Sequence, residues 1–365
     1  MRKMKPLRDQ RGVAAVMVAA ALVVLLGFTA LAVDLGYMMV TRNELQNIAD
    51  GAALGATRQL GVIYQDLHYG EMATYVCDPV LLTDVARQVA LKNTAAGKNI
   101  AVNDEDVMIG KWDAKTKTFT PTLVAADAVR VGVRRDSAAN GPVSTFFARL
   151  FGEDTMDVSA FATAALTAES TIGPGDLPIP VGISRRWFEE WGEFCNQPIK
   201  FYPTGSLEGC AGWHTYGESP PNASTLRNLL EQLKAGTYKS PEVTAGVDQL
   251  EFVGGNLASD FSDLKALFDF CKGTNDPKHY CHDKDSNPET WTTAVVIYDY
   301  EDLTSPCSNP NKPLTIVGFA TVTIEQVLTA PEKTIMASLK CGNAEEGRGG
   351  GGDYGTIGTI SGLVQ

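Results

Sequence analysis

The sequence predicts an α+β protein with a single N-terminal transmembrane helix, a helical stalk that continues it, and two exported mixed α+β domains. Three observations lead to this prediction. An apolar run covers residues 13–33, helix-like and strand-like segments alternate from residue 82 onward, and six of the seven cysteines fall within residues 181–342. A chain of 365 residues is long enough for two domains of about 150 residues each.

Charge is divided unevenly along the chain. The whole chain has a net charge of −12, from 31 basic and 43 acidic side chains. Residues 1–12 nevertheless form a basic tail, with Asp9 as its one acid and with Arg2, Lys3, Lys5, Arg8 and Arg11. An acidic body argues against nucleic-acid binding, because neutralising phosphates needs a basic face. The basic flank favours a cytoplasmic N-terminus, with the acidic bulk across the membrane.

The apolar run has the dimensions of a membrane-spanning helix. Its 21 residues lack any ionisable side chain, and at about 1.5 Å per residue they cover roughly 32 Å, close to a hydrocarbon core of about 30 Å. Its main apolar side chains are Val13, Val16, Leu22, Leu25, Leu26, Phe28, Leu31 and Val33. We expect a retained signal anchor.

Two other interpretations of this run stay open. A cleaved secretory signal would use the A-x-A site Ala30-Leu31-Ala32, although the run exceeds the usual apolar region of about 7–15 residues. A type IV prepilin would be cut after Gly12 and would carry Glu at the fifth mature position, where this chain has Met17.

A helical pattern continues past the membrane as a stalk over residues 34–60. This stretch has no proline, and small or apolar residues recur at steps of three and four. The resulting helix-packing stripe consists of Leu45, Ile48, Ala49, Ala52, Ala53 and Ala56, extended by Met38 and Leu60. Small side chains allow close approach of another backbone, so the stripe predicts packing on a partner helix, on a second copy of the chain, or on the chain's own domain. A plain connector helix is the alternative.

A small α+β domain is expected over residues 82–171, after an irregular spacer at 61–81. Helices are predicted at 82–94 and 143–151, and strands at 107–112, 117–120, 128–135 and 156–166. In the third of these strands Val129, Val131 and Val133 alternate with polar residues or glycine, as in a half-buried strand.

A linker at 172–180 leads to a cysteine-containing α+β domain over residues 181–342. Helices are predicted at 224–235 and 258–270, and strands at 292–300, 314–324 and 334–340. Cysteines of an exported segment favour disulfides. Of fifteen pairings, we expect nearest neighbours: Cys195–Cys210, Cys271–Cys281 and Cys307–Cys341, with Cys77 left free or paired between chains. Residues 343–365 predict a Gly-rich flexible tail, whose β-prone end could also pair with a partner's sheet edge.

Motifs for catalysis or metal binding are weak. His279, Cys281 and His282 lack a second zinc-ligand pair, and Asp283, Asp285 and Asn287 lack the Gly and Glu of a calcium loop. No G-x-S-x-G, P-loop or H-E-x-x-H string occurs. The aromatic region 185–216 reads as the core of a disulfide-stapled module, with a ligand-binding face as the alternative. We therefore expect no catalytic, cofactor or metal residues, and no cofactor.

The N-terminal segment resembles a known family. The basic tail, Arg11-Gly12 at the start of an apolar helix, and the string VDLGYMMVTRNELQNIADGAALGATRQL resemble TadG-like proteins of the Tad (tight adherence, Flp pilus) assembly family. The similarity covers about fifty residues, with a weaker echo to about residue 168 that includes PVSTFFARLFG and VSAFATAA. The missing Glu separates the chain from the processed TadE branch. The Asp-x-Ser-x-Ser metal string of some TadG relatives is absent.

This resemblance implies a non-enzymatic, single-pass envelope protein that takes part in assembling or anchoring a surface pilus. It implies a bacterial inner-membrane location with the bulk of the chain periplasmic or extracellular, and a role connected with cell adhesion. Partners would be the lipid bilayer and other Tad/Flp assembly proteins. Two alternatives stay open: a secreted adhesin or carbohydrate-binding module released near Ala32, and an exported hydrolase without a recognisable motif.

Overall fold

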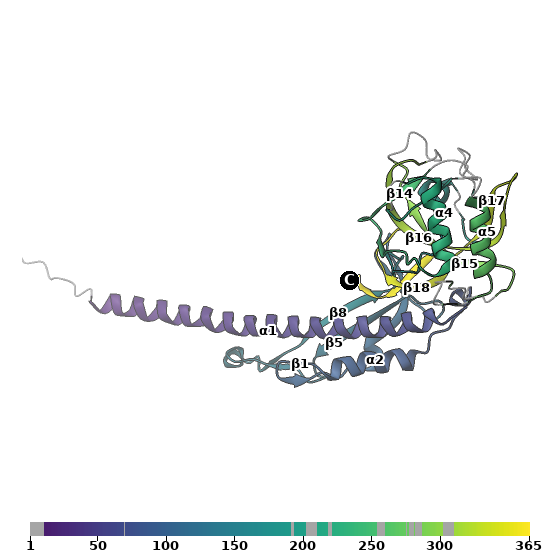
Figure 1. Ribbon diagram of the computed structural model, residues 1–365. Helices are drawn as coiled ribbons and strands as arrows, with labels where there is room; N and C mark the ends of the chain where they lie inside the picture. The colour runs from purple at the N-terminus through teal and green to yellow at the C-terminus, as the bar shows by residue number, and fades with distance from the viewer. Residues whose placement is uncertain are drawn as a thin grey trace, which may run out of the picture. The chain divides into compact units, whose positions relative to one another are not determined.

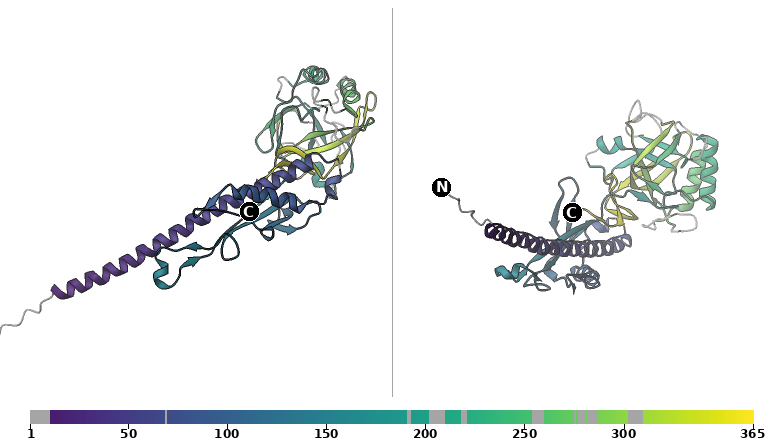
Figure 2. Two further views of the ribbon diagram at one scale, coloured as in Figure 1. Left: turned by 90° about the horizontal axis from the view of Figure 1, so that it is seen from below. Right: turned by 90° about the vertical axis from the view of Figure 1, so that its left-hand side faces the viewer.

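A computed structural model describes residues 11–68, 70–190, 193–201, 210–217, 221–253, 260–274, 276, 281, 287–301 and 310–365. The chain divides into two compact units, and five elements (α1, α2, β3, β5 and β8) run from one unit into the other. The longest is α1, Arg11–Gln65, which continues without a break from the apolar run into the stalk (Figures 1 and 2).

The first unit comprises Met1–Ala53, Thr83–Met108 and Arg130–Ala162. It contains most of α1, the end of α2 (Pro79–Leu91), the hairpin β1 (Thr94–Ala95) and β2 (Lys98–Asn99), and the 3₁₀ turn η2 (Asp104–Asp106). A second hairpin joins β6 (Val143–Ser144) to β7 (Thr155–Met156) and carries the 3₁₀ turn η3 (Ala148–Phe151).

A five-stranded sheet has the strand order β20-β8-β5-β3-β4. Its strands are β3 (Val107–Asp113), β4 (Thr118–Pro121), β5 (Ala128–Arg135), β8 (Val158–Ala165) and β20 (Gly362–Leu363). In β5 the expected alternation is confirmed, since Val129, Val131 and Val133 are buried. The last strand comes from the far end of the chain, where Leu363 pairs with Ala164.

The second unit comprises Leu54–Leu82, Ile109–Val129 and Thr163–Gln365, and its main feature is a seven-stranded sheet of order β11-β17-β16-β14-β12-β10-β15. Because β16 also pairs with β15, the strands β16, β14, β12, β10 and β15 close into a ring around an apolar core. The strands are β10 (Val181–Ser184), β11 (Pro198–Phe201), β12 (Ala211–His214), β14 (Gln249–Val253), β15 (Trp291–Tyr298), β16 (Pro313–Leu328) and β17 (Thr334–Lys340).

Two helices that pack against each other, α4 (Ala223–Ala235) and α5 (Asp260–Cys271), lie beside this sheet (Figure 1). The Asn222 side chain caps α4 by accepting from the amides of Ser224 and Thr225, and Gly236 ends it with a φ of 67°. Shorter elements complete the unit: η1 (Glu71–Ala73), β9 (Thr171–Ile172), α3 (Arg185–Glu190), β13 (Val243–Thr244), β18 (Asn343–Arg348) and β19 (Thr356–Ile360).

The predicted α+β class is confirmed, but three segments differ from expectation. Residues 143–151 form a strand and a 3₁₀ turn instead of a helix, because their amides bond to a distant carboxylate. The spacer 61–81 is partly helical, since α1 extends to Gln65 and α2 starts at Pro79. The expected flexible tail at 343–365 holds β18, β19 and β20, which pair within this chain.

The disulfides also differ. Cys271–Cys281 is confirmed, but Cys195 bonds to Cys341, with their Cα atoms 5.3 Å apart, so the expected pairs Cys195–Cys210 and Cys307–Cys341 are wrong. The cause is the antiparallel pairing of β11 with β17, which places Pro198 opposite Ser338 and continues outward toward the two cysteines. Cys210 is disulfide-bonded as well, Cys77 is free and buried, and Cys307 lies outside the described residues.

Candidate functional site

The N-terminal part of α1, up to Val33, exposes its apolar side chains, and we call this segment the rod. Among the described residues, one helix, Ala14–Gln65, is long and apolar enough to cross a membrane, and an 18-residue window within it has a mean hydropathy of 2.7. The expected lipid-facing side chains are exposed from Val16 (70%) to Val33 (45%), and include Leu22, Leu25, Leu26, Phe28 and Leu31. The side chain of Val13 lies outside the described residues. Such exposure is costly in water, so this surface is consistent with a membrane anchor.

Directly after this rod, Asp34 ties a distant loop to the helix. Its Oδ1 accepts the amide of Phe146 at 2.7 Å, and its Oδ2 accepts those of Phe147 at 2.9 Å and Ala148 at 2.6 Å. The carboxylate is 4% exposed and caps the start of η3. Burial acts to raise the pKa of Asp34, but the three donated hydrogen bonds and Arg149 together lower it below its ordinary value. We call this contact the Asp34 latch.

The small-residue stripe lies inside the folded chain. Leu45, Ala49, Ala52, Ala53 and Ala56 are 0% exposed, and Ile48 is 3% exposed. The helix bonds to the chain's own strands beside it: the Gln46 amide donates to Phe161 O at 3.1 Å in the first unit, and Thr57 Oγ1 donates to Ala164 O at 3.2 Å in the second. In this conformation the stripe is not available to a partner helix or to a second copy of the chain.

The free thiol of Cys77 is placed for packing rather than for nucleophilic chemistry. It is 2% exposed and contacts the hydroxyl of Tyr64 at 3.7 Å. Burial raises the pKa of Cys77, which is the opposite of what a reactive thiolate needs. His214 is likewise buried in the core, against Tyr216 and Phe252, and burial lowers its pKa to about 3.

An open groove of about 1250 Å³ in the second unit holds a carboxyl whose pKa is raised. Its charged lining residues are Lys111, Asp113, Lys115, Asp127, Arg348 and Asp353. Burial raises the pKa of Asp127 to about 6, even though its Oδ1 accepts the amide of Trp112 at 2.7 Å and Lys111 lies nearby. A carboxyl of this kind can bind or release one proton near pH 6.

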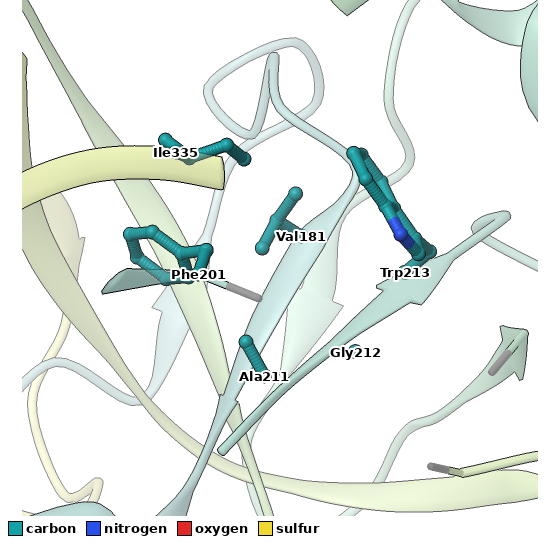
Figure 3. A pocket seen from close by; sticks show the side chains of 6 residues that line it. All are labelled: Val181, Phe201, Ala211, Gly212, Trp213 and Ile335. Atoms are coloured by element: carbon teal, nitrogen blue, oxygen red, sulfur yellow. The ribbon is translucent and has the colours of Figure 1, made fainter. Parts of the chain in front are cut away.

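The aromatic region 185–216 contributes to the core where it is described. Trp187 is 1% exposed, Trp213 is 2% and Tyr216 is 8%; Trp191 and Tyr202 lie outside the described residues. Figure 3 shows a hollow beside Trp213, lined by Val181, Phe201, Ala211, Gly212 and Ile335 as well. Its volume of about 10 Å³ has room for about one water molecule, so it is too small for a sugar.

The two metal-like strings fall mainly outside the described residues, which include only Cys281 and Asn287 of them. Cys281 is in a disulfide. Within the described part of the chain, no group of three or more His, Cys, Asp or Glu side chains is placed to hold a metal ion.

Sequence reasoning missed the Asp34 latch and Asp127. The signals for the latch were present: Asp34 is the single ionised side chain between Arg11 and Arg42, and the segment 146–151 is unusually apolar for a surface turn. Asp127 gave no signal, because its pKa depends on burial that the sequence pattern did not reveal.

Two family descriptions match this chain. The family described as putative Flp pilus-assembly TadE/G-like matches residues 12–59, and the family described as putative Tad-like Flp pilus-assembly matches residues 81–164. No curated protein and no solved structure matches the chain. The resemblance stated from the N-terminal residues is thereby confirmed.

Proposed function

We propose that this chain, a TadG-like member of the Tad/Flp pilus-assembly family, is a non-enzymatic, single-pass protein of the bacterial inner membrane that anchors part of a pilus-assembly complex. The observation that carries the proposal is the uncovered apolar rod of α1, which passes directly into a folded unit. The rod fixes the chain in lipid, while its continuation buries the stripe and holds the folded units beyond the membrane.

The disulfides support an exported location for the part of the chain that follows α1. Cys195–Cys341 and Cys271–Cys281 join residues that follow α1, and such bonds form and persist outside the reducing cytoplasm. The basic residues before the rod favour a cytoplasmic N-terminus. Together they support a topology in which residues after about 34 lie in the periplasm or outside the cell.

Contacts with other pilus-assembly proteins belong to surfaces other than the stripe, because the stripe is occupied within the chain. The non-enzymatic role is supported by the two family matches, which cover assembly components. It is also supported by the raised pKa of the Cys77 thiol, which disfavours a reactive thiolate.

The anchor is tested by comparing two charge insertions in the full chain expressed in a piliated host. A double change, Leu22→Asp with Leu26→Asp, places two carboxylates in the rod, and each costs about 2.5–3.5 kcal/mol on insertion scales. Val247→Asp is the matched control, because Val247 is an apolar side chain that is 74% exposed outside the rod.

We expect the double variant to be lost from alkali-washed membranes and to abolish piliation, while the control behaves as the unchanged chain. Intact mass and N-terminal sequencing of the membrane extract should show an uncleaved chain. A mature chain that begins at Val33 and is released in soluble form would contradict the anchor and favour a secreted module.

A further inference from the structure

The turn between β6 and β7 exposes apolar side chains that a water-facing turn would not carry. Leu150 is 77% exposed and Phe151 is 80% exposed, while Phe146 and Phe147 are 49% and 40% exposed. We call residues 146–151 the apolar loop. Four large apolar side chains on six consecutive residues make a contiguous patch, and such patches mark sites that contact lipid or protein.

The apolar loop is held in one place on α1. The Asp34 latch binds the amides of Phe146, Phe147 and Ala148. The ring of Phe146 also meets the ring of Tyr37, one helical turn after Asp34, with their centroids 5.1 Å apart. Arg149 Nε closes the turn by donating to Phe146 O at 2.8 Å. The loop and residues 34–37 of α1 therefore form one local structure within the first unit.

This position is the end of the proposed membrane span. Asp34 directly follows the 21-residue apolar run, so when that run fills a hydrocarbon core of about 30 Å, the latch lies at its far boundary. Beyond Asp34, α1 stays apolar on its open side, since Leu35, Met39 and Val40 are 53–58% exposed. The exposed surface of the rod thus continues without a charged side chain until Arg42.

The latch covers the one charged side chain that would interrupt this surface. Asp34 is 4% exposed, and its two oxygens are turned to three amide donors. The composition around it suits the membrane–water interface: Tyr37 is of a residue type enriched in that layer, and Phe and Leu are the side chains with which surface-bound segments enter it. Arg149 is exposed and can pair with phosphate headgroups. Glu153 and Asp154, which are also exposed, follow directly and limit how deep the loop can enter.

We propose that the apolar loop inserts into the interfacial layer of the same bilayer that α1 crosses, on the side where α1 leaves it. The chain then has two contacts with one membrane, a spanning helix and an interfacial foot. Two contacts fix the rotation of α1 about its axis and the height of the first unit above the lipid, which a single helix cannot do. This inference rests on the proposed membrane anchor.

Lipid is the occupant that the geometry favours over a protein partner. The patch continues directly from the exposed rod, at the depth where lipid already surrounds α1. A protein partner would have to cover the loop while sharing that boundary with the headgroups. Self-association through the loop is an outcome that the test distinguishes.

The test places a fluorescent probe on the loop of the full chain. Cys77 is replaced by Ser to remove the free thiol, and Leu150→Cys is labelled with an environment-sensitive dye. Leu25→Cys in the rod and Val247→Cys on an exposed turn are labelled in the same way; Leu25 is 66% exposed and Val247 is 74% exposed, so neither change disturbs a core. The proteins are reconstituted in vesicles with equal parts of phosphatidylethanolamine and phosphatidylglycerol, with nitroxide lipids that quench either near the headgroup or deep in the acyl chains.

We expect a blue-shifted probe at 150 whose quenching by the nitroxide lipids exceeds that at 247 severalfold. If the probe at 25 is quenched and that at 150 behaves as at 247, the loop lies in water: the inference fails and the anchor stands. If the probe at 150 is blue-shifted without quenching, the loop contacts protein, and the inference fails as well. An unquenched probe at 25 would overturn the anchor itself and the inference with it.

A second variant tests the latch as a positioning residue. Asp34→Ala in the Leu150→Cys background removes the acceptor for three amides. We expect the quenching at 150 to fall toward the value at 247 while the quenching at 25 is unchanged, and Asp34→Asn, which keeps one acceptor oxygen, to restore part of it. Unchanged quenching at 150 in the Ala variant would mean that the latch does not hold the loop in the lipid.

Discussion

Asp34 is a residue whose role comes from what it binds rather than from where it lies in the sequence. A carboxylate at the end of an exposed apolar helix segment is expected to face water. Here its oxygens accept hydrogen bonds from three amides. These bonds stabilise the negative charge and give acceptors to the unpaired amides at the start of η3. One side chain thus closes the end of the rod and sets the position of a segment 112 residues later.

The latch should respond to acid in a defined direction. The folded-state pKa of Asp34 is lowered, so the stability that it contributes is present above its ordinary value of 3.8 and is lost as pH falls through the lower folded value. We expect the amides of Phe146, Phe147 and Ala148 to stay protected from hydrogen exchange at neutral pH and to lose protection below that value.

In Asp34→Ala these three amides should exchange fast at neutral pH as well. Amides of the β1–β2 hairpin, which does not contact Asp34, provide the internal reference in the same experiment. Protection of the three amides that is equal in the unchanged and Ala proteins would show that the latch does not form in solution.

Asp127 gives a prediction of opposite sign. Burial raises its pKa to about 6, so its neutral form is favoured in the folded state, and stability is lost as pH rises from about 4 to about 6. Asp127→Asn keeps an oxygen for the Trp112 amide and removes the titration. Between pH 4 and pH 6, the free energy of unfolding should fall by about 1–3 kcal/mol less in this variant than in the unchanged protein. The range follows from about 1.4 kcal/mol per pKa unit, reduced for solvent screening.

Asp113→Asn is the control, because Asp113 lines the same groove while hydrogen bonds from Thr116 and Lys115 lower its pKa. Its titration lies below the window, so this variant should keep the slope of the unchanged protein between pH 4 and 6. Denaturant unfolding in detergent at several pH values measures both. An unaltered slope in Asp127→Asn would exclude burial of this carboxyl.

At the scale of elements, α1 contains two glycines, Gly51 and Gly61, that differ in how much space a side chain would have. A Cβ on Gly51 would meet Val89 Cγ1 at 3.6 Å, an ordinary contact, whereas a Cβ on Gly61 would overlap the carbonyl of Thr359 in β19. Gly61 therefore permits the C-terminal strand to approach the helix backbone. Gly51 does not have this role, although both glycines belong to the same helix.

The pair makes a matched test. Gly51→Ala should raise the free energy of unfolding by up to about 1 kcal/mol, because alanine loses less backbone entropy in a helix. Gly61→Ala should lower it by about 1–3 kcal/mol, because the strand must move. Thermal and denaturant unfolding of the full chain in detergent compare them, and a stabilising Gly61→Ala would show that β19 does not pack on α1.

Elements whose conformation follows from signals within their own segment could be predicted from the sequence. Elements whose conformation depends on a partner far away in the chain could not. The rod, the stalk and α4 follow from runs, periodicity and caps that lie within each segment; the four leucines of α4 are all buried on one face. The composition of the apolar loop suits a helix, and the acceptor that competes for its amides, Asp34, is far away in the chain. In the C-terminal tail the distant partner is β8, with which β20 pairs, whereas β18 and β19 pair with each other within the tail.

At the scale of the whole molecule, the covalent links follow strand register rather than sequence distance. The register of β11 with β17 pairs Pro198 with Ser338 and Ile199 with Ala337. Asn196 continues it by donating to Leu339 O at 2.7 Å, which brings Cys195 opposite Cys341. Spacing along the chain could not reveal this, since 146 residues separate the two cysteines.

The two disulfides should therefore contribute different amounts to the free energy of unfolding. Cys195–Cys341 closes a long loop, while Cys271–Cys281 closes one of 10 residues. In the chain-entropy estimate the long bridge stabilises by about 5 kcal/mol and the short one by about 3 kcal/mol. The bond at Cys210 already restricts the unfolded chain, so the measured values should be smaller and their order the same.

Paired Cys→Ser variants test this order. The variant lacking Cys195 and Cys341 should unfold at a lower denaturant concentration than the variant lacking Cys271 and Cys281, because the edge strand β11 is then held to β17 by hydrogen bonds alone. The buried Trp187, Trp213 and Trp291 report unfolding by fluorescence, and a non-reducing digest verifies that the remaining bridges are unchanged. An equal or larger loss in the Cys271 and Cys281 variant would mean that the local bridge holds α5 in place by packing, and that loop length does not decide which link matters most to the second unit.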